Sequence, residues 1–134
     1  MDQLILEGLK LLVVDDDRDS RELLLVALEG DGAEVVIVES VRDAIISLQQ
    51  RIPDVLISDI RMPDESGYHL IAQVQQLETE LGILIPAIAV TAFARSNDRT
   101  DCLAAGFRRH FSKPVDLDEL SLAIAQVAER FFQS

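Results

Sequence analysis

Carboxylates gather at two points of this chain where strong repulsion calls for a counter-charge. Asp15, Asp16 and Asp17 follow one short apolar run, and Asp59 follows another. At a separation of about 4 Å and an effective dielectric constant of about 20, two such charges repel each other by about 4 kcal/mol. Acids at the carboxyl ends of neighbouring parallel strands would face one crevice, where open α/β sheets bind their ligands. We therefore expect Mg²⁺ there, because it binds few protein carboxylates and keeps positions for water and phosphate oxygens.

The elements that would position these acids form a regular alternation. Short apolar or β-branched segments alternate with segments of helical period, which is typical of βαβ units and a parallel sheet. The expected strands are residues 11–14, 33–38, 54–58, 87–91 and 108–112. Helices are expected over roughly 18–29, 66–78 and 96–105, with two more around the apolar stripes 41–48 and 117–131.

The sequence also predicts how these helices begin, end and are covered. Ser40 and Asp116 are expected N-caps. Gly30 is expected to end the first helix, whose apolar residues on almost every side predict that it is well covered. The fourth helix has one large apolar residue, Leu103, beside Cys102 and alanines, so it is a candidate for movement.

Composition narrows the class of protein. With 134 residues the chain is expected to form one domain. Its net charge of -12 argues against a nucleic-acid partner or an anionic membrane surface. The single cysteine, Cys102, permits no internal disulfide, and no apolar run is long enough for a membrane span. We therefore expect a cytoplasmic protein.

Four short motifs stand at the ends of predicted strands. In chain order they are Val13-Val14-Asp15-Asp16, Ser58-Asp59-Ile60-Arg61-Met62-Pro63 with Gly67, Val90-Thr91-Ala92 and Ser112-Lys113-Pro114. With these motifs the chain resembles the receiver domain of two-component response regulators, and residues 1–134 are expected to be one receiver domain with a core of about 9–132. The resemblance implies an α/β, flavodoxin-like (βα)5 fold, in which a five-stranded parallel sheet of order 2-1-3-4-5 has helices on both faces.

The resemblance assigns roles to the acids. Asp59 matches the phosphoacceptor, whose carboxylate attacks phosphorus and forms an acyl phosphate. Asp15, Asp16, Asp59 and the backbone carbonyl of Arg61 match the ligands of Mg²⁺, with Asp15 acting partly through water. Taken alone, Asp59 could equally cap the next turn, and Asp17 could do no more than cap the first helix.

Two further strand ends complete the expected site. Thr91 matches a residue whose hydroxyl donates a hydrogen bond to a phosphoryl oxygen, although a threonine in a strand is ordinarily only a good strand former. Lys113 matches a lysine that reaches the acids at rest and the phosphoryl group afterwards, although alone it could be an exposed loop lysine. In the family the peptide bond between this lysine and Pro114 is typically cis.

The chain departs from the family pattern near this site. Where the family usually has an aromatic switch residue, this chain has His110, whose polar ring needs a partner when it turns inward. The following Phe111 is expected on the opposite face, in the core. Arg61 and Phe93 occupy positions that tune acyl-phosphate hydrolysis in receivers, and we expect a longer phosphorylated lifetime.

The expected function is a phosphorylation-operated switch rather than an enzyme. A histidine kinase or a histidine phosphotransfer protein would supply the phosphoryl group to Asp59 in a Mg²⁺-dependent reaction, and the domain's own chemistry would be limited to this transfer and to acyl-phosphate hydrolysis. A downstream protein target would bind the surface formed by the fourth helix, the fifth strand and the fifth helix. Arg108, Arg109 and His110 form a basic cluster there, which could also be only a solvated charge cluster.

Other functions remain open at this stage. A Mg²⁺-dependent phosphatase or phosphotransferase of haloacid-dehalogenase type also uses a strand-end aspartate, but it typically has a second Asp where this chain has Arg61. A receiver that has lost phosphorylation and serves as a binding module is a second alternative. A nucleotide or flavin binder is disfavoured because no glycine-rich loop follows the first strand. The segments 6–10 and 90–95 look like receivers of hybrid histidine kinases.

Overall fold

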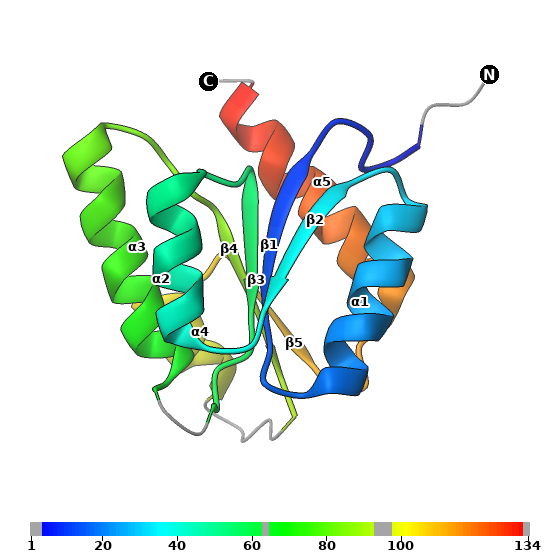
Figure 1. Cartoon of the computed structure of the whole chain (residues 1–134), viewed down its shortest axis with the longest axis horizontal. Coiled ribbons are helices and arrows are strands. Elements are labelled where there is room, and N and C mark those ends of the chain that lie inside the picture. Colours follow the sequence, from blue (N-terminus) through cyan, green and yellow to red (C-terminus); the bar gives the residue numbers. More distant parts are fainter. Residues whose placement is uncertain (1–3, 63–64, 93–97, 133–134) are drawn as a thin grey trace.

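A computed structural model of the chain describes residues 4–62, 65–92 and 98–132. Strands and helices alternate along these residues, as the sequence predicts (Figure 1). The strands are β1 (Lys10–Val14), β2 (Glu34–Val38), β3 (Val55–Ser58), β4 (Ala87–Thr91) and β5 (Arg109–Ser112). The helices are α1 (Arg18–Gly30), α2 (Val41–Gln50), α3 (Gly67–Leu81), α4 (Asp98–Ala105) and α5 (Leu117–Phe132).

The five strands form one parallel sheet in the order β2-β1-β3-β4-β5, which confirms the expected fold class. Helices α1 and α5 cover one face, and α2, α3 and α4 cover the other (Figure 1). Because all strands run in the same direction, their carboxyl ends meet at one edge of the sheet, at the bottom of Figure 1.

The core consists of two layers, one on each face of the sheet. Along β1, Leu11 and Val13 pack towards α1 and α5, whereas Leu12 and Val14 pack towards α2 and α3. Every residue of β3 is buried, because this central strand is covered on both faces. Burial on both sides explains why these strands are continuous apolar runs.

The predicted N-caps of α2 and α5 are confirmed. Ser40 Oγ accepts a hydrogen bond from the Asp43 N–H at 3.1 Å, and Asp116 Oδ1 accepts one from the Glu119 N–H at 3.0 Å. Asp17 Oδ2 accepts one from the Ser20 N–H at 2.8 Å and so begins α1. Each bond satisfies an amide that the first helical turn leaves unpaired.

Helix α1 ends at Gly30, as predicted, and Asp31 is its C-cap. The left-handed residue that follows is Gly32, with a φ of 100°. This turn packs on the segment before β1, where Leu6 is fully buried and its N–H donates to the Asp31 carbonyl at 2.9 Å. A Cβ at position 32 would lie 3.0 Å from the Glu7 Cα, so this turn requires glycine on two grounds.

The predicted cover of α1 is wrong, whereas the expectation that the fourth helix has little to bury is confirmed. Leu23 and Val26 of α1 are 55% and 70% exposed, because the helix lies on one face of the sheet and only its inner side is covered. In α4 the residue that faces the core is Cys102, which is fully buried, whereas Leu103 is 42% exposed. The fourth helix therefore buries even less apolar surface than its sequence suggests. None of the described helices is long and apolar enough to cross a membrane.

Candidate functional site

The ends of four strands converge at the carboxyl edge of the sheet. Asp15 follows β1, Asp59 follows β3, Thr91 ends β4 and Lys113 follows β5. The Asp59 N–H donates to the Val14 carbonyl at 2.8 Å, and the Lys113 N–H donates to the Thr91 carbonyl at 2.8 Å. The backbone of the sheet itself therefore holds these side chains in one place.

The three predicted carboxylates form a compact acidic cluster. One oxygen atom each of Asp15, Asp16 and Asp59 lies within 4.8 Å of the other two. Asp15 and Asp59 are 2% and 6% exposed, whereas Asp16 is exposed. Three hard oxygen donors at this spacing suit Mg²⁺, which prefers carboxylates and water. Asp17 is outside this cluster and caps α1 instead.

Lys113 supplies the counter-charge inside the cluster. Its Nζ donates to Asp15 Oδ2 at 2.7 Å and to Asp59 Oδ2 at 3.0 Å. Burial by itself would lower the pKa of Lys113, but the hydrogen bonds to Asp15 and Asp59 outweigh it and raise that pKa, so the ammonium form is favoured. The peptide bond from Lys113 to Pro114 is cis, as the family resemblance implies.

Asp59 is held in an unfavourable environment for a charged carboxylate. Burial raises the pKa of Asp59 and the nearby charge of Asp15 adds to the rise, although Lys113 opposes both. Asp59 Oδ1 accepts hydrogen bonds from the backbone N–H groups of Ile60 at 2.7 Å and Arg61 at 3.3 Å. One oxygen therefore faces the backbone and the other faces Lys113.

Two positioning residues gave no sign of this role in the sequence. Arg21 Nη1 donates to the backbone carbonyl of Asp15 at 2.9 Å, which fixes the acidic segment. Gly67 packs directly against the backbone of Asp59, where an added Cβ would lie 2.5 Å from the Asp59 carbonyl oxygen. Gly67 belongs to the quoted motif, but only the fold shows that close approach is what requires it.

A hollow of about 110 Å³ adjoins Ile60 and Arg61, the two residues that follow Asp59. It is lined by Ile60, Arg61, Ser66, Tyr68, Thr91, Asp98 and Cys102. Thr91 is 2% exposed, and its carbonyl accepts the hydrogen bond from the Lys113 N–H, so it lies next to the strand end that carries the lysine. Asp98, from the first turn of α4, forms an ion pair with Arg61, with 3.7 Å between Nη2 and Oδ2. Sequence reasoning missed Asp98 because nothing near it in the chain marks it as a partner.

His110 faces the α4 side of the sheet. In the β4–β5 register it pairs with Ala89, which packs in the layer that contains Cys102, whereas Phe111 packs in the opposite layer, as predicted. His110 Nε2 is buried and has no hydrogen-bond partner among the described residues. Burial lowers the pKa of His110, so the neutral ring is favoured. Phe93, the other variable position, lies outside the described residues.

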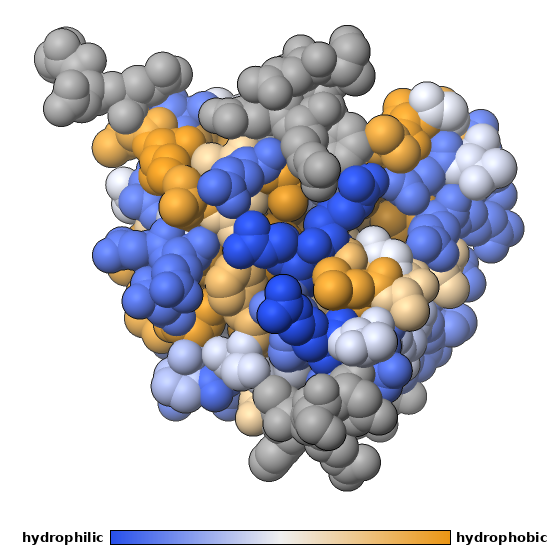
Figure 2. All heavy atoms as spheres, turned by 180° about the vertical axis from the view of Figure 1, so that it is seen from behind, coloured by the Kyte–Doolittle hydropathy of each residue, from blue (hydrophilic) through white to orange (hydrophobic). Residues whose placement is uncertain are grey.

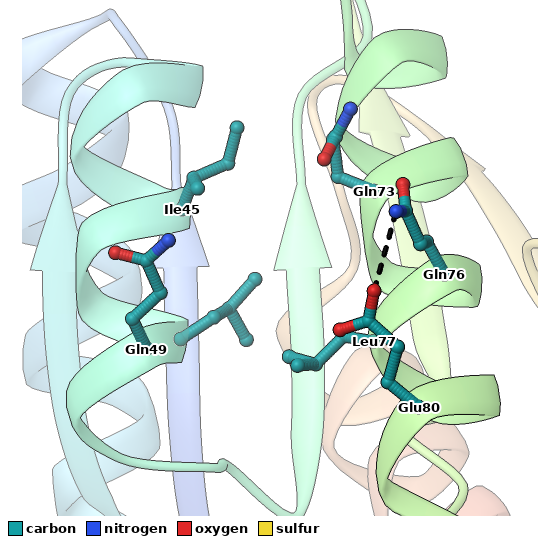
Figure 3. Close-up of a pocket in the computed structure, with 7 residues that line it drawn as sticks. Ile45, Gln49, Gln73, Gln76, Leu77 and Glu80 are labelled. Carbon is teal, nitrogen blue, oxygen red and sulfur yellow. Dashed lines mark hydrogen bonds between the residues drawn. The ribbon is translucent and has the colours of Figure 1, made fainter.

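A second hollow, between α2 and α3, holds none of the predicted site residues. It has a volume of about 240 Å³ and is lined by Ile45, Leu48, Gln49, Gln73, Gln76, Leu77 and Glu80. In Figure 3 the amides of Gln49, Gln73 and Gln76 surround it, and Gln76 donates to Glu80 at 3.3 Å.

Comparison with known proteins agrees with this geometry. The family model for the response regulator receiver domain matches residues 11–125. The "Uncharacterized 14.6 kDa protein in sodA1 3'region" of Leptolyngbya boryana is 40% identical over 94% of this chain and 95% of that protein. The sensor histidine kinase RcsC of Salmonella typhi is 35% identical over 92% of this chain, which spans only 13% of the kinase.

Solved structures show the same architecture. The signal receiver domain of a signal transduction histidine kinase from Syntrophus aciditrophicus superposes with a TM-score of 0.83, at 25% identity, over 95% of each chain. A two-component response regulator from Clostridium difficile, at 21% identity, shares the fold with a TM-score of 0.84, over 95% of this chain and 100% of that one. The chain belongs to the response regulator receiver domain family of two-component signalling.

Proposed function

We propose that this receiver is a phosphorylation-operated switch whose phosphoacceptor is Asp59. The observation that carries the proposal is the ammonium of Lys113, which bridges Asp15 and Asp59 at 2.7 and 3.0 Å beside the exposed carboxylate of Asp16. A strand-end carboxylate with a cation at hydrogen-bond distance has the geometry of a nucleophile whose incoming electrophile is anionic.

In the proposed reaction an Asp59 carboxylate oxygen attacks the phosphorus of a phosphohistidine. The bond from oxygen to phosphorus forms, the bond from phosphorus to the histidine nitrogen breaks, and the electron pair leaves with the imidazole. Lys113 donates to the transferred group and offsets its added charge of about -1.5 to -2. Thr91 donates its hydroxyl to a phosphoryl oxygen.

Mg²⁺ is part of the proposal. Asp15, Asp16 and Asp59, with the backbone carbonyl of Arg61, would hold the ion, and the compact cluster of three carboxylates supports this assignment. When bound, the ion would supply charge neutralisation for the transferring phosphoryl group.

We propose two kinds of protein partner, one that donates the phosphoryl group and one that binds in response to it. The phosphodonor is a histidine kinase or a histidine phosphotransfer protein in the cytoplasm. The downstream protein target binds the surface of α4, β5 and α5. A hollow of about 430 Å³ on this surface is lined by Arg99, Leu103, Arg108, Arg109, His110, Phe111, Ser112, Pro114, Asp116 and Glu119. Figure 2, the view from behind, has a band of strongly hydrophilic side chains across its middle with apolar side chains on either side.

The test is phosphorylation of the whole chain by phosphoramidate or acetyl phosphate with Mg²⁺, followed by intact-mass measurement. We expect a gain of one phosphate in the wild type and none in Asp59→Asn or after addition of a chelator. No gain in the wild type would refute the proposal and leave the binding-module alternative. Sustained turnover of unrelated phosphate esters would instead support the phosphatase alternative.

For the output surface, Arg109→Ala should weaken binding of the target and leave the mass gain intact. Arg109 Nη1 donates to Gln126 Oε1 at 3.2 Å, and its Cζ lies 5.6 Å from the centre of the Phe111 ring. In the sequence Arg109 is remote from Asp15, Asp16 and Asp59. Unchanged target binding in this variant would contradict the assignment of the surface.

A further inference from the structure

Arg61 is near two places where negative charge can lie. One is the Asp98 side chain of α4, which is present before phosphorylation, and the other is the proposed position of the phosphoryl group on Asp59. The guanidinium of Arg61 pairs with Asp98 at 3.7 Å. It also lines the hollow that Thr91 lines, on the side where the transferred phosphoryl group is proposed to lie. The same side chain is therefore shared between α4 and the phosphorylation site.

The ion pair is suited to exchange. The side chain of Arg61 is 42% exposed and that of Asp98 is 15% exposed, and the distance of 3.7 Å is near the outer limit for an ion pair. Pairs of this kind contribute little stability because water competes with them. A phosphoryl group offers three acceptor oxygens and nearly twice the charge of a carboxylate, and arginine binds it in a bidentate manner.

Helix α4 is built so that loss of this contact matters. It has eight residues, and Cys102 is its only fully buried hydrophobic residue. Near it, Tyr68 Oη lies 3.6 Å from Cys102 Sγ, a weak contact with sulfur. With so little apolar burial in α4, even a weak ion pair in its first turn affects how often that turn opens.

We propose that Asp98 is a positioning residue that competes with the phosphoryl group on Asp59 for the guanidinium of Arg61. This inference rests on the proposed function. In the unphosphorylated protein Asp98 holds Arg61 and thereby the first turn of α4. After phosphorylation Arg61 binds the phosphoryl oxygens and releases Asp98. Linkage requires the converse: removing the Asp98 charge makes Arg61 more available and strengthens the phosphorylated state.

Beryllofluoride with Mg²⁺ is the probe, because it is a tetrahedral stand-in for the phosphoryl group and its affinity is an equilibrium quantity. Its dissociation constant is measured from amide chemical shifts of the full chain. Asp98→Asn should tighten binding by about two- to fivefold, the range expected for one largely exposed ion pair. Asp98→Glu, which keeps the charge, should remain near the wild type.

The matched control is Asp101→Asn, which removes the other acid from the first turn of the same helix and changes the net charge equally. It should leave the dissociation constant unchanged. In the Arg61→Gln background, Asp98→Asn should have no further effect, because the shared guanidinium is gone. Amide hydrogen exchange without Mg²⁺ gives an independent readout: Asp98→Asn and Arg61→Gln should each speed exchange in residues 98–105, whereas Asp101→Asn should not.

Three results would overturn the inference. These are equal beryllofluoride affinity in Asp98→Asn and the wild type, equal tightening by Asp101→Asn, or tightening by Asp98→Asn that survives in Arg61→Gln. Failure of the underlying function is distinguishable, because then the wild type itself would show neither beryllofluoride binding nor the phosphate mass gain.

Discussion

Replacement of Lys113 by methionine tests the electrostatic design of the site most directly. The substitution keeps an unbranched apolar stem and removes the ammonium that lies 2.7 Å from Asp15 and 3.0 Å from Asp59. The two carboxylates are 2% and 6% exposed, so water cannot fully replace the lost cation. The variant should be less stable than the wild type, even though its core is unchanged.

The magnitude follows from the burial of the three groups. Breaking a buried ion pair by removing one partner costs about 3–5 kcal/mol. The Lys113 side chain is 18% exposed, so solvent screening reduces the expected loss to about 2–3 kcal/mol. For a chain of this size the loss corresponds to a Tm roughly 10 °C lower.

The sign of the pH dependence is fixed by Asp59, whose pKa is already raised above 3.8 by burial. Without Lys113 that pKa rises further, so the carboxyl is neutral over a wider range. A raised carboxyl pKa means that the folded state holds its proton more tightly than the unfolded state does. The destabilisation from the buried charge is therefore largest above the folded pKa of Asp59, decreases as the pH falls below that pKa, and is gone below the unfolded pKa.

Urea unfolding followed by far-UV circular dichroism, with a chelator and then with Mg²⁺, measures these quantities. Mg²⁺ at about 100 times its dissociation constant stabilises a protein by about 2.7 kcal/mol. The gain should be larger for Lys113→Met than for the wild type, because the ammonium no longer competes for the same oxygens. Lys10→Met, at the only other lysine, is the control and should change stability by less than about 0.5 kcal/mol. The reasoning is refuted if Lys113→Met is as stable as the wild type in chelator, or if Mg²⁺ stabilises both equally.

Two further predictions address packing. Gly67→Ala places a Cβ 2.5 Å from the Asp59 carbonyl oxygen, so the backbone must shift; we expect a loss of about 1–3 kcal/mol in urea unfolding and slower phosphorylation. Gly30→Ala, in a helix with nothing within 4 Å of the new Cβ, should instead gain about 0.5–1 kcal/mol, and a loss there would contradict the comparison. His110→Phe removes a buried nitrogen without a partner and should gain about 1 kcal/mol at neutral pH. The gain should grow below pH 6.5, because the depressed pKa of His110 makes the wild type lose stability as the pH falls from 6.5 towards that folded pKa. The control is His69→Gln, at an exposed histidine, which should change stability by less than about 0.5 kcal/mol. A gain equal to that of His110→Phe would rule out the unpaired His110 Nε2 as the cause.

The sheet could be predicted from the sequence because its strands are buried on both faces and therefore apolar without interruption. Strand limits differ from the expected ones by a single residue at β1, β2, β3 and β5, and β4 agrees. The helix caps could be predicted because capping is a local interaction. The requirement for glycine at position 32 could not, since it comes from the segment around Leu6, which precedes β1 and packs there through tertiary contacts.

The exposed face of α1 shows a second limit of sequence reasoning. Leu23 and Val26 have the composition of core residues, yet they are exposed because a helix at the surface of a three-layer fold has only one covered side. In α4 the small Cys102 is buried and the larger Leu103 is exposed. The size of its apolar side chains predicts whether a helix has apolar surface to bury. The rotation of the helix about its own axis, relative to the sheet, decides which of its residues is buried.

The site was predictable to the extent that strand ends define it. The topology brings Asp15, Asp59, Thr91 and Lys113 to one edge, and each stands directly at the end of a strand. Asp98 and Arg21 lie in helices and contribute to the site through side-chain contacts. No local sequence pattern indicates which partner such a side chain will contact.

The formal charges of the cluster support the proposal that one place accepts both a cation and an anion. Three ionised carboxylates, those of Asp15, Asp16 and Asp59, bring three negative charges, and Lys113 brings one positive charge between two of them. A divalent cation would bring the four side chains and the ion to neutrality, and a phosphoryl group with about two negative charges could then approach at modest cost. After the proposed transfer the balance would be negative again, and Arg61 is a further cation that lines the adjoining hollow. The charge added at Asp59 is thus expected to draw on the residue that pairs with α4, which would link the proposed chemistry at the sheet edge to a helix that buries little apolar surface.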